Sequence, residues 1–267
     1  MEAREILIFL SIKYEGDWEK IYDAIKRKEP ISENEIKESI SKINCKTLTL
    51  IDADYPNYLK NIFKPPFVLY FYGDITLASD TMKCISFVGT RQMTKYGEEM
   101  TRKIVSEISP YKIIVSGLAK GIDRIAHETA INCSGRTIGV LGCGIDSCYP
   151  KENLELYIVM KKDHLIISEY PHKTEPAKQQ FPQRNRLIAA LSQATIVGEA
   201  PSVRSGTLIT VQHALEMGRD VMCVPYPGNV SSMCNRLIKE GASLVESGDD
   251  VFQELHFTPE VDKKVQN

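Results

Sequence analysis

The fold is decided by the stretch Cys84-Ile-Ser-Phe-Val-Gly-Thr-Arg91, an apolar run that ends in a glycine and then turns polar. The segment 96–108 follows it, with Met100, Ile104 and Ile108 on one helical face. The predicted strands are Cys84–Gly89, Ile113–Ser116, Thr137–Gly142, Leu165–Glu169, Thr195–Glu199 and Val221–Val224, and earlier runs at 47–51 and 65–73 extend the sheet. Apolar runs that alternate with helices predict an α/β, extended Rossmann-like fold, in which helices cover both faces of a mainly parallel sheet.

Small and basic residues follow several of these predicted strands. Parallel sheets bind ligands at the carboxyl ends of their strands, where helix N-termini with unpaired N–H groups favour anions. The residues predicted to contact phosphate at these turns are Gly89, Thr90, Arg91, Ser116, Gly117, Lys120, Ser205, Gly206 and Thr207. None of the turns has the spacing of a Walker or GxGxxG loop, which argues against an NTPase or a dehydrogenase.

The segment Phe181-Pro-Gln-Arg-Asn-Arg186 lies between these turns in the sequence. Phe181 offers a face on which a base can stack, while Arg184 and Arg186 offer bidentate forks for phosphate. Only single strands expose base faces, so this combination favours single-stranded over duplex DNA. The predicted groove also includes Lys178, Asn185 and Asn235. The alternative is that Phe181 packs inside and the arginines form salt bridges.

Neighbouring features have structural interpretations. Gly89 could serve only a positive φ, with Arg91 on a solvated rim. Asp123 would repel an anion, so we expect it to cap a helix or to bond backbone N–H groups. His127 lies one helical turn further on and is predicted to be structural, so no catalytic residue is predicted. For the turn Gly142-Cys-Gly-Ile-Asp146, tight backbone packing and direct ligand contact are both open.

The composition limits the class of protein. Lys and Arg number 33 and Asp and Glu 35, a net charge of -2. This excludes a chain coated in positive charge, but it leaves room for a local basic groove. The seven cysteines form no CxxC pair, so we expect reduced, mostly buried thiols, no metal site and a cytoplasmic protein. The apolar run at residues 6–10 is too short to span a membrane, and no cofactor is predicted.

Three parts of the chain are predicted. Residues 1–45 hold three helical patterns, and a capping box of Ser32 and Glu35 opens the third. They form a small all-α domain, which is either a sterile-alpha-motif-like or helix-hairpin-helix-like module or a docking cap on the main domain. Residues 46–257 form the Rossmann-like domain. Residues 258–267 form a polar tail, and no winged-helix domain is expected.

Taken together, the motifs resemble those of the DprA/Smf family of bacterial DNA-processing proteins. They are Phe87–Arg91, Ser116–Asp123, Gly142–Pro150, Ile167–Pro171, Phe181–Arg186, Ser205–Thr210, Cys234–Ile238 and Gly241-Ala242. The resemblance implies a non-enzymatic protein that binds single-stranded DNA, protects incoming strands during natural transformation and loads RecA onto them. It also implies that Arg91 lies in the DNA pocket. The implied assembly is a homodimer through the carboxyl-terminal half of the Rossmann-like domain.

Two segments bear on alternative functions. The loop within Val224–Asn235 is shorter than the family pattern, and Cys234 replaces a small residue there, so its contacts are open. A related superfamily, the LOG-type nucleotide phosphoribohydrolases, carries PGGxGTxxE, whose glutamate serves N-glycosidic cleavage. When Gly206-Thr207 is aligned on that motif, Thr210 stands in place of the glutamate. The alternatives are a nucleotide N-glycosidase and a sensor of a small phosphorylated ligand that use the same pocket.

Overall fold

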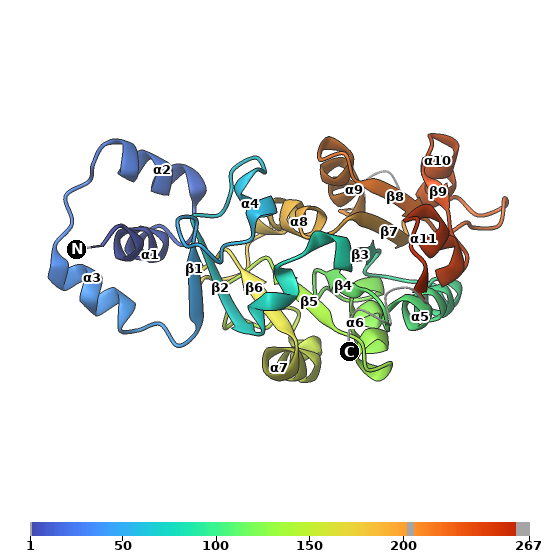
Figure 1. Ribbon diagram of the computed structural model, residues 1–267, viewed down its shortest axis with the longest axis horizontal. Helices are drawn as coiled ribbons and strands as arrows, with labels where there is room; N and C mark the ends of the chain where they lie inside the picture. The colour runs from blue at the N-terminus through green and yellow to red at the C-terminus, as the bar shows by residue number, and fades with distance from the viewer. Residues whose placement is uncertain (1, 202–205, 260–267) are drawn as a thin grey trace.

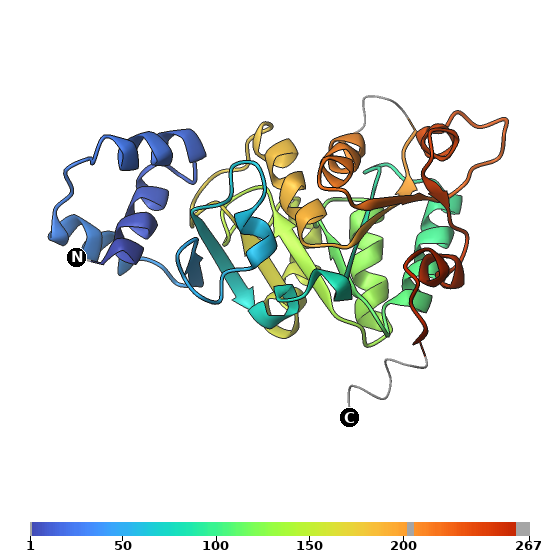
Figure 2. The same cartoon turned by 45° about the horizontal axis from the view of Figure 1, so that its top comes forward.

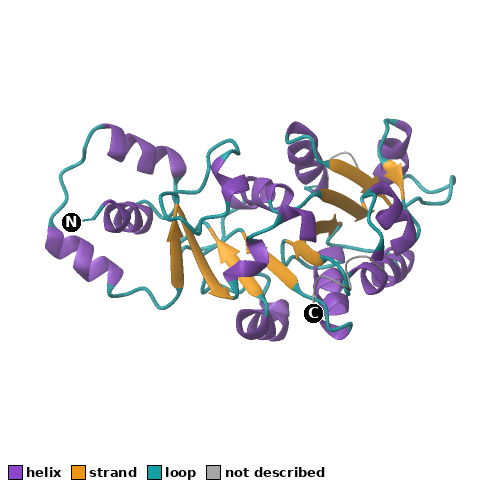
Figure 3. Ribbon diagram, viewed as in Figure 1, coloured by secondary structure: helices purple, strands orange, loops and turns teal. Residues whose placement is uncertain are grey.

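The strands of this chain form one sheet. The computed structural model describes residues 2–201 and 206–259, and within them nine strands pair in the order β1-β2-β6-β5-β4-β3-β7-β8-β9 (Figure 3). The strands are β1 Lys46–Thr49, β2 Val68–Gly73, β3 Cys84–Gly89, β4 Ile113–Ser116, β5 Thr137–Leu141, β6 Leu165–Ser168, β7 Ala194–Glu199, β8 Asp220–Cys223 and β9 Ser243–Leu244. The β1–β2 and β2–β6 pairs are antiparallel, and the others are parallel. The predicted strands are therefore confirmed, and the six from residue 84 onward differ from the observed bounds by no more than about one residue at either end.

Helices connect the strands and cover both faces of the sheet (Figure 1). They are α1 Ala3–Lys13, α2 Trp18–Lys26, α3 Glu33–Ile40, α4 Asn57–Lys60, α5 Lys95–Ile108, α6 Ile122–Asn132, α7 Leu154–Asp163, α8 Gln180–Ala190, α9 Thr207–Glu216, α10 Met233–Lys239 and α11 Gly248–Glu254. None of the helices in residues 2–201 and 206–259 combines the length and the hydropathy needed to cross a bilayer. The mainly parallel sheet with its surrounding helices is the predicted Rossmann-like arrangement.

Each strand contributes to two apolar layers, because successive side chains point to opposite faces. On one face, Val88 of β3 lies in a core cluster with Leu187 of α8 and Val211 of α9. On the other face, Ile85 of the same strand clusters with Ile104 of α5. β3 is therefore buried on both faces, as its continuous apolar run predicts, and joins the two layers.

The order of the strands reverses beside β3. The strands β4, β5 and β6 lie successively on one side of β3, whereas β7, β8 and β9 lie on its other side. The chain leaves β3 toward α5 and leaves β7 toward α9, and these two helices pack on opposite faces. A crevice opens at such a reversal, outside the carboxyl ends of the strands, and ligands of open α/β sheets bind there.

The three N-terminal helices lie beyond β1 at one end of the sheet (Figure 2). Ile8 of α1 shares a core cluster with Tyr70 of β2, and Tyr70 Oη donates to Ser11 Oγ at 3.0 Å. The predicted capping box is confirmed, since Ser32 Oγ accepts from the Glu35 N–H at 3.3 Å. These contacts fit a helical unit docked on the sheet, while the domain boundary at residue 45 stays a prediction. The predicted tail, residues 258–267, lies mostly outside the described residues.

A buried histidine joins α6 to the sheet. His127 Nδ1 lies 2.6 Å from Thr137 Oγ1 on β5, and the Thr137 hydroxyl donates to the carbonyl of Ile114 on β4 at 2.7 Å. The hydroxyl proton is engaged with the carbonyl, so the imidazole donates to Oγ1. Burial in this apolar layer lowers the pKa of His127 from 6.5 to about 3. This is the structural role predicted for His127.

The free energy of unfolding is expected to fall as the pH is lowered from about 7 toward 3. The unfolded chain protonates His127 near pH 6.5, whereas the folded chain keeps it neutral down to about 3. The stabilisation is thus complete above pH 6.5 and is lost progressively below it, by up to about 1.4 kcal/mol per pH unit. Urea unfolding at about pH 7, 6 and 5 measures this slope. In a His127→Gln variant the slope should decrease, and an unchanged slope would contradict the assignment.

Candidate functional site

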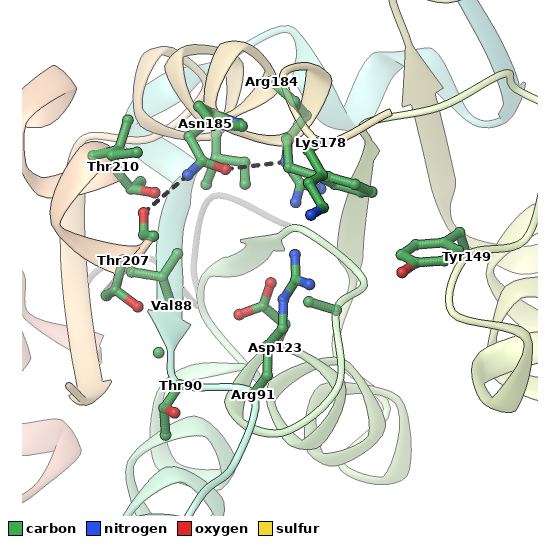
Figure 4. Close-up of a pocket in the computed structure, with 17 residues that line it drawn as sticks. Val88, Thr90, Arg91, Asp123, Tyr149, Lys178, Arg184, Asn185, Thr207 and Thr210 are labelled. Carbon is green, nitrogen blue, oxygen red and sulfur yellow. Dashed lines mark hydrogen bonds between the residues drawn. The ribbon is translucent and has the colours of Figure 1, made fainter. Parts of the chain in front are cut away.

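An open pocket lies at the reversal of the strand order. It has a volume of about 560 Å³ and is bounded by the end of β3, the start of α6 and the first turns of α8 and α9. Figure 4 shows Lys178 and Arg184 on one side of the pocket and Arg91 on the other. Of the predicted contact residues, the pocket brings together Gly89, Thr90, Arg91, Lys178, Phe181, Arg184, Asn185, Gly206 and Thr207.

A cation and two aromatic rings lie together at the pocket. Arg91 is exposed in the turn after β3, and its guanidinium carbon lies 5.3 Å from the centroid of the Phe181 ring. The Phe181 and Tyr149 rings are 5.4 Å apart at a tilt of 35°. Tyr149 is 43% exposed, so its ring is accessible to a ligand in the pocket. This arrangement suits a flat, anionic ligand, because the rings offer stacking faces and the guanidinium offers charge.

Arg184 joins α8 to the strand ends that border the pocket. It is buried, and its Nη1 donates to the carbonyl of Gly117 at 2.6 Å and to the carbonyl of Val140. Its Nε donates to Asn185 Oδ1 at 3.1 Å. A Cβ at Gly117 would lie 2.6 Å from the guanidinium carbon, so the close approach requires glycine. Arg184 is therefore a positioning residue that fixes α8 against the ends of β4 and β5.

Asp123 compensates part of the charge of Arg184. The carboxylate is buried and accepts a hydrogen bond from the Gly117 N–H at 3.1 Å, which is the backbone-bonding role expected from the sequence. Burial raises the pKa of Asp123, and the positive charge of Arg184 opposes that shift. Burial likewise lowers the pKa of Arg184, and Asp123 opposes that shift. The pair thus lets both groups lie at the base of the pocket.

Arg186 does not share the position of Arg184. It lies on the opposite face of α8, where Nη1 and Nη2 contact Glu169 Oε1 and Oε2 at 2.7 and 2.6 Å. Its Nη2 also donates to the carbonyl of Lys64 at 2.9 Å. Both side chains of the ion pair are buried, so Arg186 is occupied away from the pocket. The prediction of a second phosphate fork here is corrected, because two residues along a helix place side chains about 200° apart.

Three other predicted residues have contacts within the fold. Ser116 Oγ is buried and donates to the carbonyl of Phe87 at 2.6 Å, which joins β4 to β3. Asn235 pairs with both backbone groups of Tyr226, at 2.8 and 2.7 Å, and holds the loop before α10. Lys120 is exposed beside a smaller hollow that adjoins the pocket, with its Nζ 2.5 Å from Glu152 Oε1. Ser116 and Asn235 therefore support the site from a distance, whereas Lys120 lies at its rim.

The start of α9 forms the other wall of the pocket. Ser205 falls outside the described residues, while Gly206 and Thr207 line the pocket. Asn185 Nδ2 donates to the carbonyl of Gly206 at 3.1 Å, which connects α8 to α9. Gly89 is needed for packing rather than for a positive φ, because a Cβ there would lie 2.5 Å from Ile122 Cγ1. Its neighbour Thr90 lines the pocket through the same turn.

Tyr149 and Thr210 are among the pocket residues that were not predicted as contacts. Tyr149 follows the turn at Gly142 and Gly144, and that turn packs tightly, since a Cβ at Gly142 would lie 2.8 Å from Phe181 Cδ1. Thr210 is buried one turn into α9 and also lines the pocket. The signal for Tyr149 was its place after a glycine-rich strand exit. The path of that loop decides the position of the ring, and no periodicity in the sequence reports it.

Substitution of Arg186 should affect stability rather than ligand binding. Arg186→Ala leaves the Glu169 carboxylate buried without its partner, and breaking such a pair costs about 3–5 kcal/mol. Chemical unfolding measures the loss. The affinity for DNA, measured at a denaturant concentration well below the unfolding midpoint, should equal that of the protein without the substitution. A large loss of affinity for DNA with an unchanged free energy of unfolding would show that Arg186 binds the ligand.

Comparison with known proteins gives a consistent family. A family model described as DNA recombination-mediator protein A matches residues 46–256. The chain is 43% identical over 216 residues to the DNA processing protein DprA of Bacillus subtilis, across 78% of this chain and 71% of that protein. It is 41% identical over 213 residues to DprA of Streptococcus pneumoniae, across 79% of this chain and 74% of that protein.

Two solved structures are similar over most of their length. DprA from Streptococcus pneumoniae matches with a TM-score of 0.77 and 35% identity, covering 96% of this chain and 94% of that one. DprA from Helicobacter pylori, whose structure describes its single-stranded DNA binding mode, matches with a TM-score of 0.72 and 30% identity, covering 80% and 97%. The chain therefore belongs to the family of DNA recombination-mediator protein A, whose members are named DprA or Smf.

Proposed function

We propose that this chain binds single-stranded DNA in the pocket between β3, α8 and α9. The observation that carries the proposal is the contact of the Arg91 guanidinium with the Phe181 ring, beside the accessible ring of Tyr149. The rings can stack with unpaired bases while the guanidinium binds a phosphate. In a duplex the faces of the bases are covered by the neighbouring base pairs, so this arrangement favours a single strand. The Helicobacter pylori relative, described for its single-stranded DNA binding, supports the same function here.

The charges of the pocket suit a short segment of backbone. Arg91 and Lys178 supply exposed positive charge, and Lys120 adds to it from the adjoining hollow. Backbone N–H groups in the first turn of α9 favour a phosphate beside Thr207. Each phosphate that is neutralised on a single strand contributes about -0.7 to the slope of log affinity against log salt concentration. A few such contacts give modest affinity for each protomer.

The first test is the substitution Arg91→Ala. Loss of a charge-assisted contact should weaken binding of fluorescein-labelled oligothymidylate about tenfold, and the salt slope should become shallower by about 0.7. Fluorescence anisotropy over a range of salt concentrations measures both effects. The matched control is Arg102→Ala, because Arg102 lies on α5 and pairs with Glu98 at 2.9 Å outside the pocket.

Two outcomes of that test would contradict the proposal. One is equal affinity for oligothymidylate and for a duplex of the same length. The other is an Arg91→Ala variant that binds as well as the Arg102→Ala control. Because Arg184 is buried and fixes two strand ends, its substitution disturbs the fold and is less informative than that of Arg91.

We further propose that the function is binding without catalysis. The pocket has Thr210 at the position of the glutamate used by LOG-type nucleotide phosphoribohydrolases. Asp123, the acid that lines the pocket, is bonded to the Gly117 N–H, and Glu199 at the end of β7 accepts a hydrogen bond at 2.9 Å from the N–H of Thr94, the N-cap of α5. Release of free base from AMP would favour the enzyme. Stabilisation by nucleotides but not by oligothymidylate would favour the ligand sensor.

Protection of incoming strands and RecA loading are proposed on the family relationship alone. Membership of the DprA family supports both roles for this chain. The seven free cysteines, four of them buried, suit a reducing cytoplasm. RecA-driven strand exchange on DNA coated with single-strand binding protein separates loading from binding, because a chain that binds DNA without accelerating exchange lacks the loading role.

We also propose that the chain forms a homodimer through α9 and α10. An apolar groove of about 360 Å³ runs between these helices, lined by Leu208, Val211 and Leu215 of α9 and by Met233 and Leu237 of α10. Leu215 is 60% exposed, which is unusual for a leucine in the middle of an apolar surface. A two-fold contact would bury this surface and place two DNA pockets on one assembly.

Leu215→Glu should shift the assembly to monomers. A charge in the contact leaves a buried carboxylate unpaired, while the exposed side chain leaves the folding of the protomer unaffected. Light scattering after size exclusion measures the mass, and Ile158→Glu is the matched control, since Ile158 is 56% exposed on α7. Long oligonucleotides should bind the Leu215→Glu variant more weakly than the control. A variant that stays dimeric would place the contact elsewhere.

A further inference from the structure

A second group of aromatic side chains lies outside the pocket, where α2 meets the loop before β2. The rings of Trp18 and Tyr22 stack with centroids 5.1 Å apart and planes 10° apart. On its other side Trp18 stacks with Phe67, at 5.3 Å and 25°. Phe63, from the same loop, is linked to these rings through Lys64, which lies near both Trp18 and Phe63, and we call these four aromatic residues the aromatic platform. Stacked rings at a surface are the element on which single-stranded nucleic acids place their bases.

Packing against the rest of the protein explains the positions of only two of the four platform side chains. Trp18 and Phe67 are half-buried and join α2 to the main domain, and Trp18 Nε1 donates to the carbonyl of Pro65 at 2.8 Å. Tyr22 and Phe63, however, are 45% and 79% exposed. A large apolar side chain that is exposed to this extent next to other rings is typical of a binding surface.

A lysine provides positive charge between the rings. Lys64 Nζ lies 5.8 Å from the centroid of Trp18 and 5.2 Å from that of Phe63. It also contacts Glu19 Oε1 at 2.5 Å, and Glu19 is 60% exposed in its side chain. An exposed ion pair of this kind is weak, so a phosphate can replace the carboxylate at little cost. Cation and rings together repeat the chemistry of Arg91 and Phe181 in the pocket.

The platform and the pocket are linked through α8, which lines the pocket and also contacts the backbone of Lys64. Tyr170 Oη is 3.2 Å from Gln183 Oε1, two residues beyond Phe181 on α8. The backbone of Tyr170 lies against Gly16, which precedes α2 by two residues, since a Cβ at Gly16 would be 3.3 Å from Tyr170 Cα. Arg186 of α8 donates to the carbonyl of Lys64. Helix α8 therefore lines the pocket on one face, and Arg186 on its other face holds the backbone of Lys64.

We propose that the aromatic platform is a second contact for single-stranded DNA, on which a strand held in the pocket places further bases. This inference rests on the function proposed above. Tyr22 and Phe63 stack bases, and Lys64 meets a phosphate after release from Glu19. Continuity with the pocket and the lysine between the rings favour a nucleic acid over a proline-rich peptide, which would need no cation there.

The fluorescence of Trp18 tests the proposal directly. Trp18 is the one tryptophan of the chain, so its emission reports on the platform alone. Oligothymidylates of about 4 and about 20 nucleotides are titrated into the full-length protein, with anisotropy of a label to report total binding. The longer strand should bind with a change in tryptophan emission as bases cover the rings. The shorter strand should bind the pocket with much less change.

Substitutions at the platform should separate the two contacts. Phe63→Ala is expected to weaken binding of the longer strand roughly five- to tenfold, the loss of one stacked base, and to leave binding of the shorter strand unchanged. Glu19→Gln frees Lys64 and should tighten binding of the longer strand a few-fold at low salt. Ile158→Ala, an exposed apolar change on α7, is the control.

Each outcome decides between the two proposals. Binding of both strands with constant tryptophan emission, and with Phe63→Ala equal to the control, would overturn the platform and leave the pocket in place. Absence of binding by anisotropy would overturn both. A change in emission on addition of a proline-rich peptide, but not of the longer strand, would assign the platform to a protein partner and contradict the inference.

Discussion

The guanidinium of Arg184 lies buried where the ends of β4 and β5 meet the first turns of α8. Buried carbonyl groups at strand ends require donors, and Arg184 supplies them to Gly117 and Val140. These hydrogen bonds go to neutral oxygens, so part of the positive charge is retained at the base of the pocket. Asp123 compensates part of that charge, so an incoming phosphate meets the exposed positive charges of Arg91 and Lys178 as well. Phe181 and Asn185 take their positions from α8, Lys178 lies in the turn before it, and the pocket depends on the hydrogen bonds of Arg184.

Arg184 and Arg186 show how helical geometry separates two similar residues. From the sequence, both arginines were predicted to bind phosphate in one groove, because they are of the same residue type and only two positions apart. In α8 they point to opposite faces, and Glu169 at the end of β6 takes up Arg186 completely. Arg186 also donates to the carbonyl of Lys64, which holds the same face of α8 to the loop before β2. Arg184 therefore positions α8 at the pocket, while Arg186 fixes the opposite face of the same helix.

The alternation of apolar runs and helices was sufficient to predict the sheet, because parallel strands buried on both faces have a distinct composition. The same pattern locates the ends of the strands. Gly89, Thr90 and Arg91 lie at the end of β3 and line the pocket, as predicted from that position. Side chains placed by loops were not predictable. Tyr149 reaches the pocket from a loop, and Asn235 at the start of α10 binds Tyr226 of the preceding loop instead. The paths of these loops leave no periodic signal.

The chain carries a small net negative charge, so affinity for a polyanion cannot come from the overall field and has to come from local contacts. One pocket with a few cations holds a short segment weakly. A strand that also reached the second contact proposed on the same protomer would bind there at the effective concentration set by the nucleotides between the two, and the proposed dimer would extend this further. Linked contacts lose affinity steeply when the strand is shortened, whereas a single strong pocket would bind short and long strands alike. The dependence on strand length therefore follows from the distribution of charge over the molecule.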